Sequence, residues 1–375
     1  MQCSRCDNTD PRYFYRGMRG LYCRRCIKFG DVKLPEISSR IVDSEYQLKF
    51  ELTEKQKEVS SGLTEMVRQG RSVLLEAVCG AGKTEIIFEM VSDQLKRGRK
   101  VGFTIARRQV VLEIAERLSR AFTNLSVIPV CQGHTDVTMA DLVVCTTHQL
   151  FRYNDYFDVL IIDEPDAFPF KGDDTLKGIA RHACHGSTVY LTATPDEQLK
   201  KRVDDGELEY LYLSKRPHGF PLCVPEAFYG NRLFLLIRGI RWMIREIRQE
   251  RKVLVFVPRK RTGELFQRIL GLFVSCNNID SNSEEKDSII QNFREGRFKV
   301  LFSTNILERG VTFSNVQVLV YKADSGVFDE ASLVQISGRV GRDIRYPEGD
   351  CLFLAESRRE SIDGCISGIR RANSD

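Results

Sequence analysis

The chain has 375 residues, more than one ordinary hydrophobic core accommodates, so we expect two or three domains. With 42% hydrophobic and 29% charged residues it has the composition of a globular protein, which excludes a disordered chain. No apolar run approaches the roughly 18 residues that cross a bilayer, and the N-terminus lacks the apolar core of a secretory signal. We therefore expect a cytoplasmic protein without a transmembrane segment.

The net charge of +5 is modest, but it is concentrated at the start of the chain. Residues 1–28 hold seven basic side chains against two aspartates. A basic terminal module of this kind fits a nucleic-acid partner. The alternative is a solvated charged surface, and charge alone does not decide between the two.

Two Cys-x2-Cys pairs, Cys3 with Cys6 and Cys23 with Cys26, are separated by sixteen residues. Each pair turns two thiolates toward one point, and two pairs complete the tetrahedral ligand set of a structural Zn²⁺ site. Two disulfides or a redox pair are the alternatives, and a reducing cytosol disfavours both. Because fewer than thirty residues bury little apolar surface, metal binding would supply the folding energy of this module.

Aromatic and basic side chains alternate between the two cysteine pairs. Aromatic rings beside arginines are typical of surfaces that stack bases and contact phosphates of single strands. The alternative is that the rings only fill the small core of the module. The residues are Tyr13, Phe14, Tyr15 and Tyr22 with Arg12, Arg16 and Arg19.

From about Thr53 onward, short β-branched runs alternate with amphipathic stretches. This alternation predicts a parallel sheet covered by helices, an α/β lobe. The predicted strands are 72–77, 101–105, 125–130, 141–145, 158–163 and 188–192, and the predicted helices start near Lys83, Gln109, Leu176 and Asp196.

A segment rich in Pro and Gly then interrupts the pattern before a second alternation begins. The predicted fold class is α/β with two tandem lobes of similar size behind the small cysteine module. The second lobe is expected to contain helices over 231–250 and 261–270 and strands over 252–257, 299–303, 316–321 and 351–355. The expected domains are 1–50 (zinc module and connector), 51–213 (first lobe), 214–226 (linker) and 227–375 (second lobe).

The stretch "LLEAVCGAGKTEI" joins the predicted strand 72–77 to a predicted helix, as a phosphate-binding loop requires. Backbone N–H groups of the loop would surround phosphate oxygens, Lys83 would reach the β- and γ-phosphates, and Thr84 would bind Mg²⁺. Ala77 replaces the first glycine of the motif, which strand geometry tolerates. The nucleotide-binding residues predicted here are Gly80, Ala81, Gly82, Lys83 and Thr84.

The remaining parts of an ATPase site are also present. "VLIIDEPDAF" supplies Asp163 for Mg²⁺ and Glu164 to orient or deprotonate the attacking water. In "QISGRVGR", Arg339 and Arg342 are predicted to share a helical face, one turn after Gln335, and to stabilise charge during γ-phosphoryl transfer. A surface acidic pair and a solvated basic helix are the alternatives. Together the motifs predict ATP hydrolysis in a cleft whose closure is coupled to the reaction.

These motifs, in this order, resemble those of superfamily-two helicases, which implies two RecA-like lobes. The resemblance makes Gln56 of "LTEKQ" the reader of adenine. "TIARRQVVLEIAERL" resembles motif Ia, although Ala106 stands where proline is usual, and "VVCTTHQLF", "LTATP" and "FSTNILERGVTF" resemble motifs Ib, III and V. The implied DNA contacts are Arg107, Thr146, Thr147 and Thr304, and the implied coupling residues are Thr192, Thr194 and Gly310.

The match narrows to the ComFA family, late-competence ATPases of Gram-positive bacteria that help to take up transforming DNA. "DEPDAFPF", "ILERGVTF" and "QISGRVGR" behind a four-cysteine module carry this resemblance, with Pro165 where valine is usual. It implies bound zinc, single-stranded DNA as substrate, and ComFC and the membrane DNA channel as partners. The expected location is then peripheral, at the inner face of the cell membrane, and an oligomeric state is left open.

Three functions fit the sequence. The first is an ATP-driven translocase on single-stranded DNA that serves DNA uptake. The second is a replication-restart or RNA helicase, which the general motifs also permit. The third is an ATP-gated clamp that holds nucleic acid without moving, although such a clamp has no need of the hydrolytic residues Glu164, Arg339 and Arg342.

Overall fold

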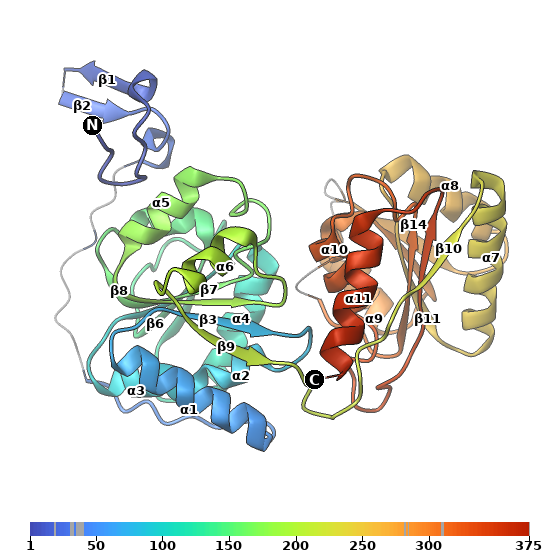
Figure 1. Cartoon of the computed structure of the whole chain (residues 1–375), viewed down its shortest axis with the longest axis horizontal. Coiled ribbons are helices and arrows are strands. Elements are labelled where there is room, and N and C mark those ends of the chain that lie inside the picture. The colour runs from blue at the N-terminus through green and yellow to red at the C-terminus, as the bar shows by residue number, and fades with distance from the viewer. Residues whose placement is uncertain are drawn as a thin grey trace. The chain divides into compact units, whose positions relative to one another are not determined.

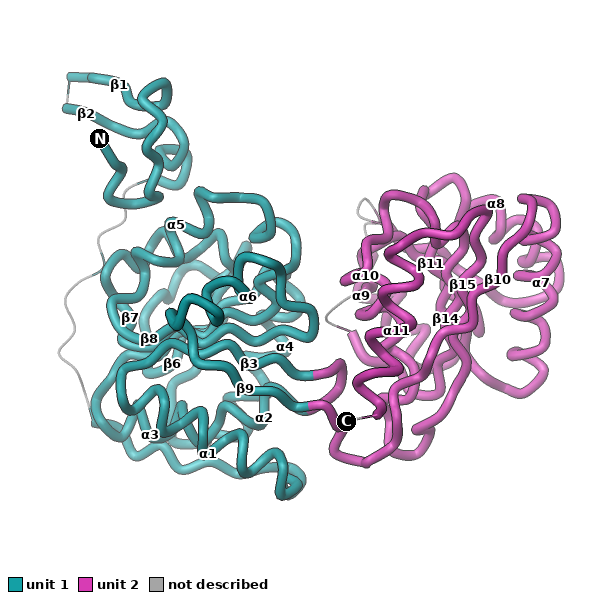
Figure 2. The backbone as a smooth tube through the Cα atoms, in the orientation of Figure 1, with its two compact units in different colours: residues 1–77, 82–213 teal, residues 78–81, 214–375 magenta. Residues whose placement is uncertain are grey.

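The computed structural model describes residues 1–18, 20–30, 34, 41–280, 283, 285–308 and 311–374. The chain divides into two compact units (Figure 2). Unit 1 comprises Met1–Ala77 and Gly82–Leu213, and unit 2 comprises Val78–Ala81 and Ser214–Asp375. The cysteine module belongs to unit 1, together with the first α/β lobe.

The cysteine module is a two-stranded antiparallel hairpin with a short 3₁₀ turn on either side. Its register pairs Phe14 with Cys23 and Gly17 with Gly20. Arg19 lies outside the described residues. The elements are η1 (Pro11–Tyr13), β1 (Phe14–Gly17), β2 (Gly20–Cys23) and η2 (Ile27–Phe29).

The first lobe is a seven-stranded sheet in the order β5-β6-β4-β7-β8-β3-β9, and every neighbouring pair is parallel. All five residues of both β4 and β6 are buried, as expected for strands covered on both faces. The strands are β3 (Val73–Ala77), β4 (Val101–Ile105), β5 (Val127–Val130), β6 (Leu142–Thr146), β7 (Phe157–Asp163), β8 (Cys184–Thr192) and β9 (Glu209–Leu213).

Helices cover both faces of this sheet, with α1 and α3 on one side and α5 and α6 on the other (Figure 1). Helix α1 begins with a capping box in which Thr53 and Gln56 satisfy each other's backbone N–H groups. The helices are α1 (Glu54–Arg68), α2 (Lys83–Ile86), α3 (Phe88–Lys96), α4 (Arg108–Ala121), η3 (Thr147–Arg152), α5 (Asp174–Ala183) and α6 (Glu197–Asp204).

Unit 2 holds a six-stranded parallel sheet in the order β10-β15-β14-β11-β13-β12. Its strands are β10 (Glu226–Tyr229), β11 (Lys252–Phe256), β12 (Cys276–Ile279), β13 (Val300–Ser303), β14 (Val316–Tyr321) and β15 (Cys351–Ala355). Its helices are α7 (Arg232–Arg248), α8 (Lys260–Leu270), α9 (Lys286–Arg294), η4 (Asn305–Leu307), α10 (Glu330–Ser337) and α11 (Glu360–Ser374).

The predicted fold class is confirmed: two α/β lobes with parallel sheets follow a small cysteine module. Every strand predicted from the sequence is present, with shifts of a few residues at the ends. Strands β9, β10 and β12 of the lobes and the hairpin strands β1 and β2 of the cysteine module were not predicted. Among the described residues, no helix has both the length and the apolarity that crossing a membrane requires.

Candidate active site

The phosphate loop follows β3 directly. Ala77 is the last residue of that strand and pairs with Leu213 of β9, so alanine at this position has the strand geometry it needs. Gly82, the N-cap of α2, has φ of 83° and Gly80 has φ of 82°, a conformation that favours glycine at both positions. The Lys83 ammonium donates a hydrogen bond of 3.3 Å to the Ala77 carbonyl, and Thr84 is buried in the first turn of α2.

Gln56, the predicted adenine reader, is buried, and its side chain completes the cap of α1. The Gln56 Oε1 atom accepts hydrogen bonds from the Thr53 N–H at 2.9 Å and from the Thr53 hydroxyl at 3.2 Å. These contacts fix the orientation of the Gln56 side chain. Its role toward adenine stays a prediction.

The two predicted acidic residues lie where β7 ends. Asp163 is the last residue of the strand, and Glu164 follows with φ of 54°, which is uncommon for a residue other than glycine. The Glu164 N–H donates to the Leu191 carbonyl at 2.9 Å, so the chain turns sharply while it stays bonded to β8. Strained backbone of this kind is concentrated at functional sites, which supports Glu164 as part of one.

Asp166 is a site residue that the sequence analysis missed. Its carboxylate is buried and accepts hydrogen bonds from the hydroxyls of Thr192, at 2.6 Å, and Thr194, at 2.8 Å. The Thr194 N–H in turn donates to the Thr192 hydroxyl at 3.0 Å. The loop after Asp163 and Glu164 is thereby tied to the two threonines that were predicted to couple ATP hydrolysis to the strand.

The parallel sheet brings five motifs to one edge. Because carboxyl ends of parallel strands lie at the same edge, the phosphate loop after β3, the threonines after β8 and the acidic pair after β7 are consecutive neighbours. Next along that edge come the segments after β4 and β6, which carry the predicted nucleic-acid contacts. The edge therefore runs from the predicted nucleotide-binding residues to the predicted nucleic-acid contacts without interruption.

The predicted nucleic-acid contacts of unit 1 differ in exposure. Arg107 is the N-cap of α4 and is partly exposed. Thr146 and Thr147 are only 8% and 1% exposed, whereas the next residue, His148, is exposed. Partial desolvation, together with the nearby Lys28 charge, lowers the pKa of His148 and so favours its neutral form. His148 is thus the side chain that this segment presents to solvent.

In unit 2, Arg339 and Arg342 do not share a helical face, so that prediction is wrong. Helix α10 ends at Ser337 with Gly338 as its C-cap, and both arginines lie in the turn that follows. Gly341 has φ of 69°, which ends any continuation of the helix. Gly338 and Gly341, the two glycines that lower helix propensity in this sequence, lie where the helix ends and in the turn that follows it.

The remaining predicted residues of unit 2 are placed as follows. The buried Arg339 donates to the Val311 carbonyl, and the partly exposed Arg342 donates to the Gly338 carbonyl at 2.8 Å. Gln335 is buried on α10, and its side-chain oxygen accepts from the Cys79 thiol at 3.3 Å. Thr304 is the N-cap of η4, and Gly310 lies outside the described residues.

Arg216 is a second residue that the sequence analysis missed, since it lies in the predicted linker. It is 3% exposed, and its guanidinium donates to four carbonyl oxygens within unit 2. Burial, together with the nearby Arg342 charge, lowers the pKa of Arg216 to about 10. The acceptors are Cys79 at 2.9 Å, Val340 at 3.0 Å, Gly341 at 2.9 Å and Gly338 at 3.3 Å.

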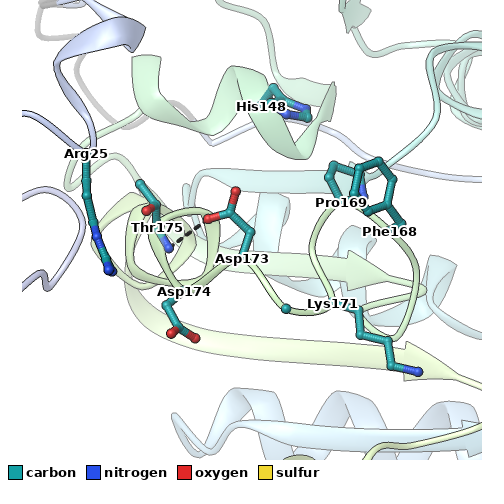
Figure 3. A pocket seen from close by; sticks show the side chains of 9 residues that line it. Arg25, His148, Phe168, Pro169, Lys171, Asp173, Asp174 and Thr175 are labelled. Atoms are coloured by element: carbon teal, nitrogen blue, oxygen red, sulfur yellow. Dashed lines mark hydrogen bonds between the residues drawn. The ribbon is translucent and has the colours of Figure 1, made fainter.

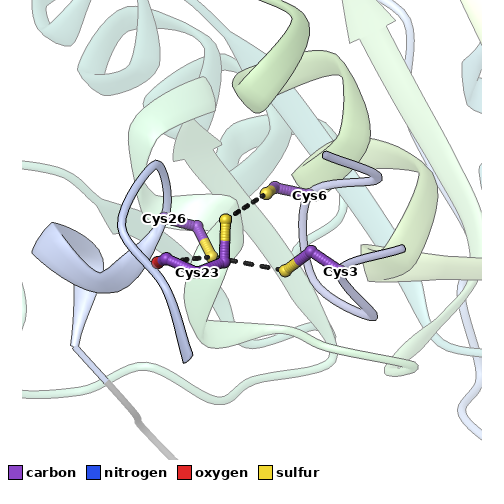
Figure 4. A group of neighbouring side chains, drawn as sticks. All are labelled: Cys3, Cys6, Cys23 and Cys26. Carbon is purple, nitrogen blue, oxygen red and sulfur yellow. Dashed lines mark hydrogen bonds between the residues drawn. The ribbon is translucent and has the colours of Figure 1, made fainter. Parts of the chain in front are cut away.

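The four N-terminal cysteines form one buried cluster (Figure 4). Their sulfur atoms all lie within 4.8 Å of one another, with 3.6 Å between Cys3 and Cys26 and 3.8 Å between Cys6 and Cys23. A tetrahedron with Zn–S distances of about 2.3 Å has S–S distances of about 3.8 Å, so this donor set fits Zn²⁺. Burial raises the pKa of Cys6 to about 12, which a bound cation would reverse by stabilising the thiolate.

A hollow of about 500 Å³ lies where the cysteine module meets the first lobe (Figure 3). Arg25 of the module, His148 of η3 and residues around the start of α5 line it. Asp173, the N-cap of α5, accepts from the Thr175 N–H at 2.9 Å. Phe168, at 85% exposure, forms part of the rim.

Two helicase-type domain families match the chain. Residues 49–197 match the family described as type III restriction enzyme, res subunit, and residues 236–343 match the helicase conserved C-terminal domain. Among solved structures, Saccharomyces cerevisiae Dbp5 bound to RNA and ADP BeF3 has a TM-score of 0.60 at 15% identity, covering 86% of this chain and 92% of that one. This likeness shows the fold.

Two competence proteins match nearly the whole chain. The ComFA protein of Bacillus subtilis (strain 168) is 34% identical over 99% of this chain and 85% of its own length. The ComFA protein of Streptococcus pneumoniae (strain ATCC BAA-255 / R6) is 34% identical over 99% of this chain and 90% of its own length.

The two parallel-sheet lobes, the ordered motifs at the sheet edge and the domain matches define an ATP-hydrolysing enzyme of the helicase type. Its helicase domains imply ATP and Mg²⁺ as the nucleotide and its metal. At 34% identity over 99% of its length, the chain belongs to the ComFA family of competence proteins.

Proposed function

We propose that this protein is an ATP-driven motor on single-stranded DNA that serves the uptake of transforming DNA. The observation that carries the proposal is the order of motifs along one edge of the unit 1 sheet, from the phosphate loop after β3 to the segment after β6. A change at the nucleotide end of this edge is transmitted to the nucleic-acid end through neighbouring strands and through Asp166, which bonds both Thr192 and Thr194.

The residues of unit 1 supply most of the proposed chemistry. Lys83 and the loop N–H groups hold the phosphates, and Thr84 and Asp163 would hold Mg²⁺, which would neutralise phosphate charge. Glu164 takes a proton from the attacking water as the new P–O bond forms and the bond to the ADP oxygen breaks. Gln335, Arg339 and Arg342 are the proposed contributions of unit 2, and Arg342 is the more exposed of the two arginines.

The remaining proposed assignments concern partners and metal. We propose that Zn²⁺ occupies the four-cysteine site, because sulfur spacing and burial both suit it. We propose that the single-stranded DNA is contacted by Arg107, Thr304 and the exposed His148. Membership of the ComFA family supports ComFC and the membrane DNA channel as partners, and a location at the inner face of the cell membrane.

The test is ATP turnover with and without single-stranded DNA, measured on the wild type, Lys83→Ala and Glu164→Gln. We expect DNA to stimulate the wild type, Lys83→Ala to lose nucleotide binding, and Glu164→Gln to bind ATP but turn it over roughly 10²–10⁴-fold more slowly. Turnover that DNA leaves unchanged would overturn the proposal.

Two further arms separate the alternatives. RNA of equal length should stimulate turnover less than DNA, and equal or greater stimulation would favour an RNA helicase. Movement of single labelled molecules along DNA in the presence of ATP is expected of a motor, and DNA binding without movement would favour a clamp.

A further inference from the structure

We propose that the metal-loaded cysteine module braces the nucleic-acid face of the first lobe, by docking on α5 and η3 and holding η3 in place. The docking follows from contacts within unit 1. Its consequence for strand binding rests on the proposed function, because only that function makes the segment from Thr146 to His148 a nucleic-acid contact. The module thus has a role beyond any contacts that it makes with DNA itself.

The first point of docking is the middle of α5. A Cβ atom built on Gly178 would lie 2.2 Å from the carbonyl oxygen of Cys6 and 2.8 Å from its Cα. Glycine inside a helix lowers helix stability by roughly 1 kcal/mol relative to alanine, so its presence here needs a reason. The reason is that the backbone of a metal-ligand residue lies directly against the helix.

Polar contacts one turn further along α5 fix the same approach. The Asp7 carboxylate accepts from Arg181 at 2.7 Å and lies 2.8 Å from the Nε2 atom of His182. Asp7 has φ of 57°, and its N–H donates to the Cys3 carbonyl at 3.0 Å. The turn from Cys3 to Asp7, which carries two of the metal-binding cysteines, therefore also orients the Asp7 carboxylate. Folding of this turn and its contact with α5 are therefore linked.

The second point of docking is η3. Cys26 is the N-cap of η2, and Phe29 is the last residue of that turn. The Phe29 ring is stacked on Phe151, with 5.7 Å between ring centroids, and is 6.5 Å from the His148 ring. Both partners belong to η3, so the second cysteine pair is connected to the segment that presents His148 to solvent.

The module and the lobe also share one hydrophobic core. The four cysteines cluster with buried residues of the lobe, including Leu150 of η3 and Leu176 and Ile179 of α5. The hollow of Figure 3 lies at the same contact between the module and the lobe, since Arg25, His148 and the start of α5 line it. A module folded by metal therefore adds to the packing around η3 and α5, and a metal-free module, which is too small to fold alone, cannot do so.

The test uses the full chain with zinc, and its main variant is Gly178→Ala. Alanine is favoured inside a helix, so α5 itself should be no less stable, but its methyl group cannot coexist with the Cys6 backbone. Gly368→Ala in α11 is the matched control, because no atom lies within 4 Å of a Cβ at that position. Phe29→Ala removes the second contact without touching the first.

Three readouts are compared: the rate of zinc transfer to a chromogenic chelator, hydrogen exchange of residues 147–152, and affinity for a labelled single-stranded oligonucleotide. Gly178→Ala should release zinc about tenfold faster or more, because overpacking separates module and lobe. Exchange in η3 should rise in both Gly178→Ala and Phe29→Ala, and both should bind the oligonucleotide several-fold more weakly. Gly368→Ala should match the wild type throughout.

The outcomes separate the docking from the proposed function. If both Gly178→Ala and Phe29→Ala release zinc and exchange the η3 amides at the wild-type rates, the docking is overturned. Faster release and exchange with unchanged oligonucleotide affinity would overturn the brace on the nucleic-acid face. If Gly178→Ala does not fold, Phe29→Ala decides alone. A wild type that binds no oligonucleotide contradicts the proposed function, while zinc release and exchange still test the docking.

Discussion

Asp166 shows how a single buried carboxylate connects two motifs. Replacing it with asparagine keeps its size but exchanges one accepting oxygen for an NH₂ group, so one of the hydroxyls of Thr192 and Thr194 loses its acceptor. We expect Asp166→Asn to lower the free energy of unfolding by about 1–3 kcal/mol. It should also reduce the stimulation of ATP turnover by single-stranded DNA more than basal turnover. Denaturant unfolding and the turnover assay measure both.

Asp174→Asn, an exposed change in the first turn of α5, is the control and should lower stability by no more than about 1 kcal/mol. Combining Asp166→Asn with Thr194→Val isolates the pair, since the second change should add little once the first is made. Full additivity of the two effects would show that the hydrogen bond between Asp166 and Thr194 does not carry the link.

Arg216 holds the turn that contains Arg339 and Arg342. The Arg216 guanidinium donates to four backbone carbonyls, a geometry that lysine cannot reproduce from one nitrogen. Arg216→Lys should therefore leave buried carbonyls without donors and lower the stability of unit 2 by about 1–3 kcal/mol. The measurement is the unfolding midpoint together with ATP turnover, which should fall as the turn loosens.

The comparison for Arg216→Lys is Arg232→Lys, an exposed change of the same chemistry at the start of α7. It should shift stability by less than about 0.5 kcal/mol. Equal effects of the two substitutions would mean that the four carbonyl contacts contribute no more than a surface arginine does.

At the scale of elements, most of the strands that the sequence revealed lie inside a sheet, and β5, a partly buried edge strand, is the exception. Strands β4, β6 and β14 are buried at every position and each has a single polar residue, Thr104, Thr146 or Gln317, so their sequences are nearly continuous hydrophobic runs. In the two lobes, the strands that were not predicted are all at sheet edges: β9 in unit 1, and β10 and β12 in unit 2. The hairpin strands β1 and β2 of the cysteine module were not predicted either. Edge strands are half exposed, and "EYLYL" and "CNNI" accordingly carry polar residues that obscure the pattern.

The site was predictable to a similar degree. Lys83, Asp163 and Glu164 could be predicted because each lies at or just after the end of a buried strand in a recognisable motif, and the four cysteines because metal geometry fixes their spacing. Asp166 and Arg216 were not found, since their importance arises from hydrogen bonds to residues distant in sequence. Such contacts depend on how turns fold, and no periodicity encodes them.

Gly102, the second residue of β4, tests how tightly the central strands must pack. A Cβ there would lie 2.6 Å from the ring of Phe157, the first residue of β7. Although glycine is disfavoured in strands, Gly102→Ala should destabilise unit 1 by about 1–3 kcal/mol, because the ring has to move within a filled core. Denaturant unfolding should show this loss, whereas Gly368→Ala should be neutral or stabilising. A stabilised Gly102→Ala would contradict the packing argument.

At the scale of the whole molecule, charge is distributed unevenly. The excess of seven basic over two acidic residues in 1–28 equals the net charge of +5 of the entire chain, so the other residues are balanced. A Zn²⁺ ion with four thiolates contributes −2, which leaves the module positive. Several of its charges are exposed on its surface, and Arg24 lies 4.3 Å above the Tyr15 ring, beside which a base could stack.

The salt dependence of DNA binding decides whether these charges contact phosphates directly. Each phosphate contact with a single strand contributes about 0.7 to the slope of log K against log salt concentration. Replacing the exposed Arg16, Arg24 and Lys28 with glutamine should therefore make that slope shallower by about 2 if all three contact phosphates. Affinity should fall most at low salt, as anisotropy titrations over a range of salt concentrations would measure.

The matched control removes three charges elsewhere. Arg232, Arg241 and Arg248 are exposed on α7 of unit 2, and their replacement with glutamine changes the net charge by the same amount. Long-range attraction responds equally to both triple variants at low salt, but only lost phosphate contacts change the slope. Equal slopes in the two variants would exclude direct contacts by the module. The module would then act on DNA through its docking on α5 and η3 alone.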